Sequence, residues 1–323
     1  MNADLHQDND PSPLAAPAFE WEYEGRIVVL DNGARMPTMP AFDRLMALNA
    51  FAVVVLDPAS ILHANKNIKE LPEFQVFGHA TLGSGEDAVL YACMDPLESA
   101  TLEPVIAGDL SERTRLRRKV VAQLPISTLR LDAIEGLDHI DWLLLDDRND
   151  ILAALEHGTR ALAHTSLVDI RIPFRDAYAG QSRFLQAIPW MQAHGFSFHG
   201  FANVGHKSLL PEGKFFAKNK ATRWEWADAI FLPDAARLAG MDNGRTTKLA
   251  CVVDLAYGMH DLAAELLGRL DSDTASRYLD ARGYVSPYFK EPDTFTLTVA
   301  NAPVPWQDLK IDNPLPHAEG EPA

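Results

Sequence analysis

Short apolar runs rich in β-branched residues alternate along the chain with segments of helical spacing, and this alternation limits the fold more than any other feature. The runs include RIVVL (26–30), FAVVVL (51–56), IDWLLLD (140–146) and LVDIRIPF (167–174). Continuous apolar runs are typical of strands that helices cover on both faces. Because such strands alternate with helices, we predict an α/β fold with a doubly wound, mainly parallel sheet.

Further strand-like segments are FQVFGHA (74–80), VLYACM (89–94), KVVAQL (119–124), FSFHGFANV (196–204) and EWADAIFL (225–232). After about residue 206 a long helical pattern runs from Leu249 to Leu270. We therefore predict disordered tails at 1–20 and 303–323, an α/β domain at 21–205 and a mostly helical extension at 206–302. The extension is expected to pack on the sheet edge or to serve self-association, so a homo-oligomer formed through the C-terminal helices is one prediction.

Charge and cysteine content exclude several classes of partner. The chain carries 29 Lys and Arg against 45 Asp and Glu, a net charge of -16 that repels a phosphate backbone, so we expect no nucleic-acid partner. Cys93 and Cys251 lack metal-ligand spacing, so we expect no metal site and a reducing compartment. No window approaches the ~18 apolar residues of a membrane span, so we expect no membrane association and a cytoplasmic location.

Two strand ends carry residues suited to a nucleoside ligand. The first strand runs into Asp31-Asn32-Gly33, and the second ends at Asp57-Pro58. In α/β folds a glycine turn lets the backbone approach such a ligand, while an acid after the second strand accepts hydrogen bonds from ribose hydroxyls. Asn32-Gly33 alone also suits an ordinary turn, and Asp57-Pro58 alone suits a helix start. Together they predict a ligand crevice at the carboxyl ends of the strands.

Over roughly residues 26 to 204 the chain resembles the FkbM-type methyltransferases. The resemblance is carried by VVLDNGARMP, by VVVLDPASILHANKNIKELPEFQVFGHATLGSGEDAVLYACMDP and by ISTLRLDAIEGLDHIDWLLLD. That family shows a strand into D-x-G-A, a strand into F-E-P, an A-L-G-x-x-x-G segment before a strand ending in L-Y, and later an I-D-F-L-K-I-D strand. The order and spacing of these motifs match those of the present chain.

The resemblance implies a class I, Rossmann-like methyltransferase fold with S-adenosylmethionine as the cofactor. It implies a hydroxyl of a sugar or another small metabolite as the methyl acceptor. It places Asp31 and Gly33 near the methionine end of the cofactor and Asp57 at its ribose. Asp146 matches the aspartate that ends the family's I-D-F-L-K-I-D strand, close to the transferred methyl group, and is the implied catalytic residue.

Several positions depart from the family pattern. Pro37 replaces the glycine that closes the first loop, and four residues replace the lysine, first glutamate, glycine and second glutamate of the motif around Asp146, namely Leu144, Arg148, Asn149 and Ile151. Asp147 could substitute for Asp146, although adjacent side chains on a strand point to opposite faces. Two alternatives stay open: an active methyltransferase, or a catalytically inactive relative that serves as a binding or assembly module. A nicotinamide-dependent dehydrogenase is disfavoured because no full GxGxxG is present.

Pro37 also leads to an expectation about the first loop. Residues before proline avoid the α region, so Met36-Pro37-Thr38-Met39-Pro40 is predicted to run extended, with a helix delayed to about Ala41. Such a loop would move the anion-binding helix N-terminus away from the crevice and weaken cofactor binding.

Overall fold

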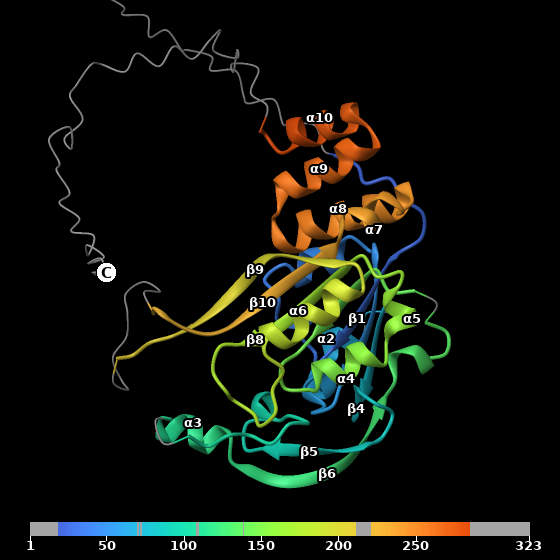
Figure 1. Ribbon diagram of the computed structural model, residues 1–323. Coiled ribbons are helices and arrows are strands. Elements are labelled where there is room, and N and C mark those ends of the chain that lie inside the picture. The colour runs from blue at the N-terminus through green and yellow to red at the C-terminus, as the bar shows by residue number, and fades with distance from the viewer. Residues whose placement is uncertain are drawn as a thin grey trace, which may run out of the picture.

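A seven-stranded sheet forms the centre of the computed structural model (Figure 1), which describes residues 19–69, 71, 73–107, 110–137, 139–210 and 221–284. β10 is antiparallel to both of its neighbours, and the other neighbouring pairs are parallel. The predicted α/β class with a mainly parallel sheet is thereby confirmed. In sheet order the strands are β3 (Phe74–Gly78), β2 (Phe51–Asp57), β1 (Ile27–Asn32), β7 (Trp142–Leu145), β8 (Leu167–Pro173), β10 (Arg223–Pro233) and β9 (Phe196–Lys207).

Helices cover both faces of this sheet because successive side chains of each strand point to opposite sides. In β7, Trp142 and Leu144 belong to one apolar core, while Leu143 and Leu145 belong to the other. The first core includes side chains of α1 (Phe42–Ala47), and the second is closed by α4 (Ile151–Glu156), α5 (Thr159–Leu162) and α6 (Phe184–Ala193). Burial on both faces explains why these strands are continuous apolar runs in the sequence.

Three C-terminal helices complete the first core and stack outward from the sheet (Figure 1): α8 (Asn243–Tyr257), α9 (His260–Leu270) and α10 (Ser272–Ala281). Gly258, with φ +67°, ends α8 and divides the predicted helical pattern into two helices. The boundary predicted after residue 205 falls inside β9, and β10 of the predicted extension is a strand of the central sheet. Extension and sheet therefore share one core. Self-association through these helices stays a prediction.

A separate three-stranded sheet lies beside the carboxyl ends of the central strands (Figure 1), in the order β4-β6-β5. Two predicted strands, VLYACM and KVVAQL, belong to this antiparallel pair and not to the parallel sheet. The Asn32 side chain joins the two sheets, since its Oδ1 accepts hydrogen bonds from Thr81 Oγ1 at 2.9 Å and Leu82 N at 3.0 Å. The bounds are β4 (Ala80–Leu82), β5 (Asp87–Cys93) and β6 (Val120–Leu129).

Short helices fill the connections. They are η1 (Met36–Thr38), η2 (Ile61–Ala64), α2 (Lys66–Lys69), η3 (Pro96–Glu98), α3 (Glu112–Arg117), η4 (Leu131–Ala133) and α7 (Ala235–Ala239). In the described part of the chain, none of the helices combines the length and the apolar character needed to cross a membrane. The predicted disordered tails, 1–20 and 303–323, lie outside the described residues except for Phe19 and Glu20.

If α9 belongs to the common core, Leu266→Ala should destabilise the whole protein. Leu266 is buried in the first core, and removing a buried leucine side chain costs about 2–5 kcal/mol. Urea denaturation followed by circular dichroism should show one transition at a lower midpoint. The control is Leu185→Ala on α6, where the side chain is 79% exposed and the expected change is within about 0.5 kcal/mol. Two separate transitions would show that the C-terminal helices fold as an independent unit.

Candidate active site

The strand order reverses direction between β1 and β7. The chain passes from β1 outward through β2 to β3, and later returns to β7 on the other side of β1. In open α/β sheets, ligands bind at such a reversal, outside the carboxyl ends of the strands. The sequence-predicted residues Asp31, Gly33, Asp57 and Asp146 all lie at this edge, at or just after the ends of β1, β2 and β7.

Asp31 is a buried residue that organises the turn after β1. Its Oδ2 accepts a hydrogen bond from the backbone N–H of Met36 at 2.7 Å, while its Oδ1 has no hydrogen-bond partner among the described residues. Burial raises the pKa of this carboxyl to about 6, against the lowering effect of the backbone N–H groups of Arg35 and Met36. The carboxylate therefore faces its own loop and holds that loop in place.

The first loop differs in part from the expectation based on Pro37. The α-helix is delayed as predicted, since α1 begins at Phe42 with Ala41 as its N-cap. The extended path was wrong for Met36–Thr38, which forms the 3₁₀ helix η1 with Arg35 as its N-cap, whereas Met39, which precedes Pro40, is extended as predicted. The bond from Met36 N–H to Asp31 and a second bond from Thr38 Oγ1 to the Arg35 carbonyl, at 2.7 Å, hold this turn despite the proline.

Gly33 permits a close approach between the first turn and the end of β7. It has φ +132°, and a Cβ at this position would lie 2.5 Å from the Cβ of Asp146. A side chain cannot be accommodated there without moving β7. The next residue, Ala34, also has positive φ, at +58°. The glycine that the sequence singled out is thus required by packing of the protein against itself.

Asp57 ends β2 beside this turn, and its two carboxylate oxygens have different surroundings. Oδ2 accepts a hydrogen bond from Leu62 N at 2.8 Å and so caps η2, whereas Oδ1 is buried without a hydrogen-bond partner among the described residues. A small crevice touches Asp57, Gly33, Ile61 and Arg148, and it leaves no room for a water molecule. Asp57 therefore offers an unused acceptor at a crevice that is closed.

The side chain of Arg148 covers the small crevice between Gly33 and Asp57. Its Nη2 donates to the Gly33 carbonyl at 2.7 Å, its Nη1 donates to the Leu97 carbonyl at 3.0 Å, and its Nε donates to Asp146 Oδ1 at 2.6 Å. Asp146 also accepts from the backbone N–H of Arg148 at 3.0 Å. The guanidinium thus lies across the turn at Gly33 and bridges three segments of the site.

Asp146 and Asp147 both lie beyond β7, which ends at Leu145, so both can line the same cavity. Burial disfavours the charge of Asp146, but Arg148 and Arg171 outweigh burial and lower its pKa. Burial and the charge of Asp146 raise the pKa of Asp147 to about 7. Gln181 Nε2 orients Asp147 by donating to its Oδ2 at 2.9 Å. At neutral pH, Asp147 is the carboxylate that can take up or release a proton.

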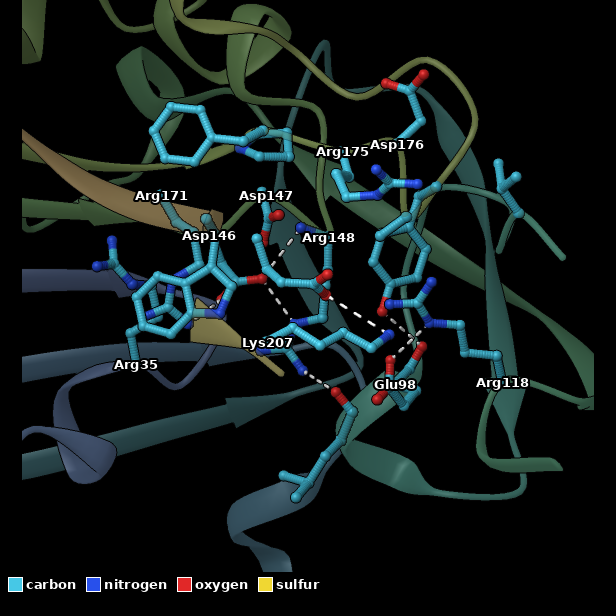
Figure 2. Close-up of a pocket in the computed structure, with 18 of the residues that line it drawn as sticks. Arg35, Glu98, Arg118, Asp146, Asp147, Arg148, Arg171, Arg175, Asp176 and Lys207 are labelled. Atoms are coloured by element: carbon cyan, nitrogen blue, oxygen red, sulfur yellow. Dashed lines mark hydrogen bonds and ion pairs between the residues drawn. The ribbon is translucent and has the colours of Figure 1, made fainter. Parts of the chain in front are cut away.

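A cleft of about 810 Å³ opens above these residues (Figure 2). Its polar floor lies at the strand ends, and its wall includes the aromatic side chains of Tyr178, Phe174 and Trp226. Among the described residues, the charged side chains in its lining are mainly cationic. The cations are Arg35, Arg118, Arg148, Arg171, Arg175, Arg183, Lys207 and Arg223, and the carboxylates are Glu98, Asp146, Asp147, Asp176 and Glu225.

Below the floor, a buried ion-pair network joins the first turn to the far half of the sheet. Arg35 Nη2 lies 2.9 Å from Asp169 Oδ1 and 2.6 Å from Asp228 Oδ1. Arg171 pairs with Asp228 at 3.0 Å and stacks on the Trp226 ring, 4.0 Å from its centroid. Burial of Asp169 raises its pKa, while Arg35 and the Tyr257 hydroxyl, which donates to its Oδ2 at 2.7 Å, act to lower that pKa.

These positions test whether the site fits S-adenosylmethionine, the cofactor that the resemblance implies. The unpartnered Oδ1 of Asp57 is a suitable acceptor for a ribose hydroxyl. At Gly33, where the resemblance places the methionine end of the cofactor, the carbonyl already accepts a hydrogen bond from the guanidinium of Arg148. Asp57 therefore fits the cofactor, whereas Arg148 covers the backbone of Gly33 in this structure. For metals, the described residues contain no cluster of three or more His, Cys, Asp or Glu side chains placed to bind an ion.

Sequence reasoning missed three functional side chains at this edge: Arg35, Arg148 and Arg171. Arg148 was identified only as a departure from the family motif, and nothing local in DDRND indicates that its side chain turns back over Gly33. A signal did exist for Arg171, since a charged residue within the apolar run LVDIRIPF needs a buried partner. Asp132 is not among the residues that line the cleft, and its carboxylate caps α5 by accepting from Arg160 N and Ala161 N.

Comparisons with known proteins give likenesses in fold. No family model matches the chain, and the search of curated proteins finds no relative. A methyltransferase from Thermoplasma acidophilum described as putative has 10% identity and a TM-score of 0.33, covering 65% of this chain and 68% of its own. Precorrin-6y C5,15-methyltransferase from Geobacter metallireducens has 13% identity and a TM-score of 0.31, covering 66% and 84%. The 23S rRNA methyltransferase ErmE has 12% identity and a TM-score of 0.31, and the match covers 78% of this chain and 93% of that chain. Likenesses this low do not assign a family, and the argument for the site rests on the chain's own residues.

The raised pKa of Asp147 predicts a stability difference that depends on pH. The unfolded chain releases this proton near pH 4, while the folded protein keeps it up to about pH 7. Folding stability contributed by this group is therefore present below pH 4 and is lost as the pH rises from 4 to 7. Asp147→Asn removes the effect, so its free energy of unfolding relative to wild type should increase between pH 4 and pH 8, by roughly 4 kcal/mol at most, because a shift of about three pKa units is worth about 1.4 kcal/mol per unit. Urea denaturation at both pH values measures this, and an equal difference at both would contradict the raised pKa.

Proposed function

We propose that this chain is an S-adenosylmethionine-dependent methyltransferase that acts on a hydroxyl group of a sugar or another small metabolite bound in the cleft. One observation carries the proposal: Asp147, with a pKa of about 7, lies in a cleft of about 810 Å³ that is also lined by Ala34 and Arg35 of the turn after β1 and by the end of β8. A cavity of this size at the carboxyl ends of a doubly wound sheet is typical of a small-molecule site.

On this proposal the chain's residues divide the work of binding and proton transfer. Asp57, whose Oδ1 is unpartnered, would hold the ribose of the cofactor, and the backbone at Gly33 would lie at its methionine end. The cofactor supplies an activated methyl group, so the protein has mainly to align the acceptor hydroxyl. Asp147 takes the proton of that hydroxyl as general base, oriented by Gln181. Asp146 holds Arg148 by an ion pair and has the lowered pKa of a structural carboxylate.

A second candidate function is a catalytically inactive binding module on the same scaffold. The position of Arg148 favours it, because the guanidinium satisfies three acceptors around Gly33 and leaves no volume beside Asp57. The two candidates differ in one measurable property: whether S-adenosylmethionine enters when Arg148 is removed.

Calorimetric titration with S-adenosylhomocysteine should therefore separate them. Arg148→Ala should bind the ligand at least about tenfold more tightly than wild type, because the Gly33 carbonyl no longer has to lose a charged hydrogen bond. Adding Asp57→Ala to this variant should abolish binding. Arg269→Ala on the exposed face of α9 is a control for loss of one positive charge.

Because Arg148→Ala leaves Asp146 less compensated, the double variant Asp146→Asn/Arg148→Ala keeps the test valid if the single variant unfolds. No binding by any folded Arg148 variant at millimolar ligand would contradict the methyltransferase proposal and support the inactive module.

Transfer itself can be measured with labelled S-adenosylmethionine and a low-molecular-mass metabolite extract. Asp147→Asn should lower transfer by about 10²-fold or more, as expected for loss of a general base, while binding of S-adenosylhomocysteine stays unchanged. An Asp147→Asn protein with full activity would assign the proton transfer to another group.

A further inference from the structure

Lys207 on β9 and Arg223 on β10 form a like-charged pair across two strands. They are register partners in the antiparallel β9–β10 ladder, so their side chains stand on the same face of the sheet, and both line the cleft. Figure 2 shows Lys207 extending into the space between the labelled side chains. Like charges directly opposite each other on neighbouring strands destabilise a sheet, so this pair works against folding in the ligand-free protein.

One carboxylate serves both cations. Lys207 Nζ lies 4.0 Å from Glu225 Oε2, and Arg223 Nη2 lies 3.1 Å from Glu225 Oε1. In addition, the Nε of Arg223 is buried and has no hydrogen-bond partner among the described residues. The pair thus keeps a net positive charge and an unused N–H donor.

The other carboxylates of the cleft have other partners: Asp176 pairs with Arg183 at 2.7 Å, and Asp147 accepts a hydrogen bond from Gln181 Nε2 at 2.9 Å. Glu98 pairs with Arg118 at 3.0 Å and with Arg117 at 2.8 Å, while Asp146 pairs with Arg148 at 2.6 Å. Within the described residues, the two positive charges of Lys207 and Arg223 are therefore balanced inside the cleft only by the single carboxylate of Glu225. This local excess contrasts with the net charge of -16 on the whole chain.

We propose that Lys207 and Arg223 form an anion subsite that binds a phosphate or carboxylate group of the acceptor, so the substrate class is acidic small metabolites. The proposal rests on the proposed function, because that function makes this cleft the acceptor site. A guanidinium and an ammonium on one face provide charge-assisted donors for an anionic oxygen. Asp147 at the strand ends and the anion subsite on β9 and β10 would then bind two different parts of one molecule.

The test compares three probes of similar size by calorimetry without cofactor: glucose, glucuronate and glucose 6-phosphate. Wild type should bind at least one of the two anions about tenfold or more tightly than glucose, and the preference should fall as salt is raised. Lys207→Gln and Arg223→Gln should each remove most of that preference. The matched control Arg269→Gln lies outside the cleft, pairs with Glu265, and should leave the preference unchanged.

A second measurement separates ligand binding from a structural role. Because it removes a like-charge opposition, Lys207→Gln should leave the melting temperature of the ligand-free protein unchanged or raise it. Equal affinity for glucose and both anions, no binding of any probe, or an anion preference that survives both variants would each overturn the proposal. If the anions bind but S-adenosylhomocysteine binds to no Arg148 variant, the methyltransferase proposal fails and the anion subsite stands.

Discussion

The buried guanidinium of Arg35 is the interaction on which the geometry of the site depends. Arg35 lies in the turn after β1, and its guanidinium donates to the carbonyls of Leu145 at 2.9 Å and Asp169 at 3.1 Å. The same group forms ion pairs with the carboxylates of Asp169 and Asp228. One side chain thereby fixes the first turn against β7, β8 and β10. A buried ion pair gains little net stability over apolar packing, but the loss of one partner is severe because a charge is left uncompensated. The network is best understood as a device that sets the relative positions of strand ends.

Charge balance extends this device to the floor of the cleft. Arg35, Arg148 and Arg171 face Asp146, Asp169 and Asp228, and the carboxyls of Asp31 and Asp147 lie beside this cluster with raised pKa values. The excess positive charge of the cleft therefore resides at its more exposed rim. The protein thus has a net negative charge but a cleft lined mainly by cations. A cleft lined by one sign of charge focuses the electric field and attracts ligands of the opposite charge.

The strands and the edge where the candidate residues meet were predictable from the sequence, because apolar runs buried on both faces have a strong local signature and parallel strands bring their carboxyl ends together. The remaining features depend on contacts distant in sequence. The turn at Met36 depends on the carboxylate of Asp31, and the closure over Gly33 depends on the path of a single arginine side chain, Arg148. The Lys207–Arg223 pairing follows from a β9–β10 register that contains bulges, which no alternation pattern reveals.

Two adjacent carboxyls acquire different properties here because their neighbours differ. Arg148 lowers the pKa of both Asp146 and Asp147, while the charge of Asp146 raises that of Asp147. Withdrawal of Arg148 would raise both pKa values and leave the buried Asp146 poorly compensated. On the proposed function, the cofactor would supply a positive charge when bound, and Asp146 would be the carboxylate available to compensate it. Arg148 would then keep Asp146 compensated in the ligand-free protein, and the pKa of Asp147 would stay near 7 only while a cation compensates Asp146. The position of Arg148 over Gly33 and the pKa of Asp147 would thus both depend on one ion pair, Arg148–Asp146.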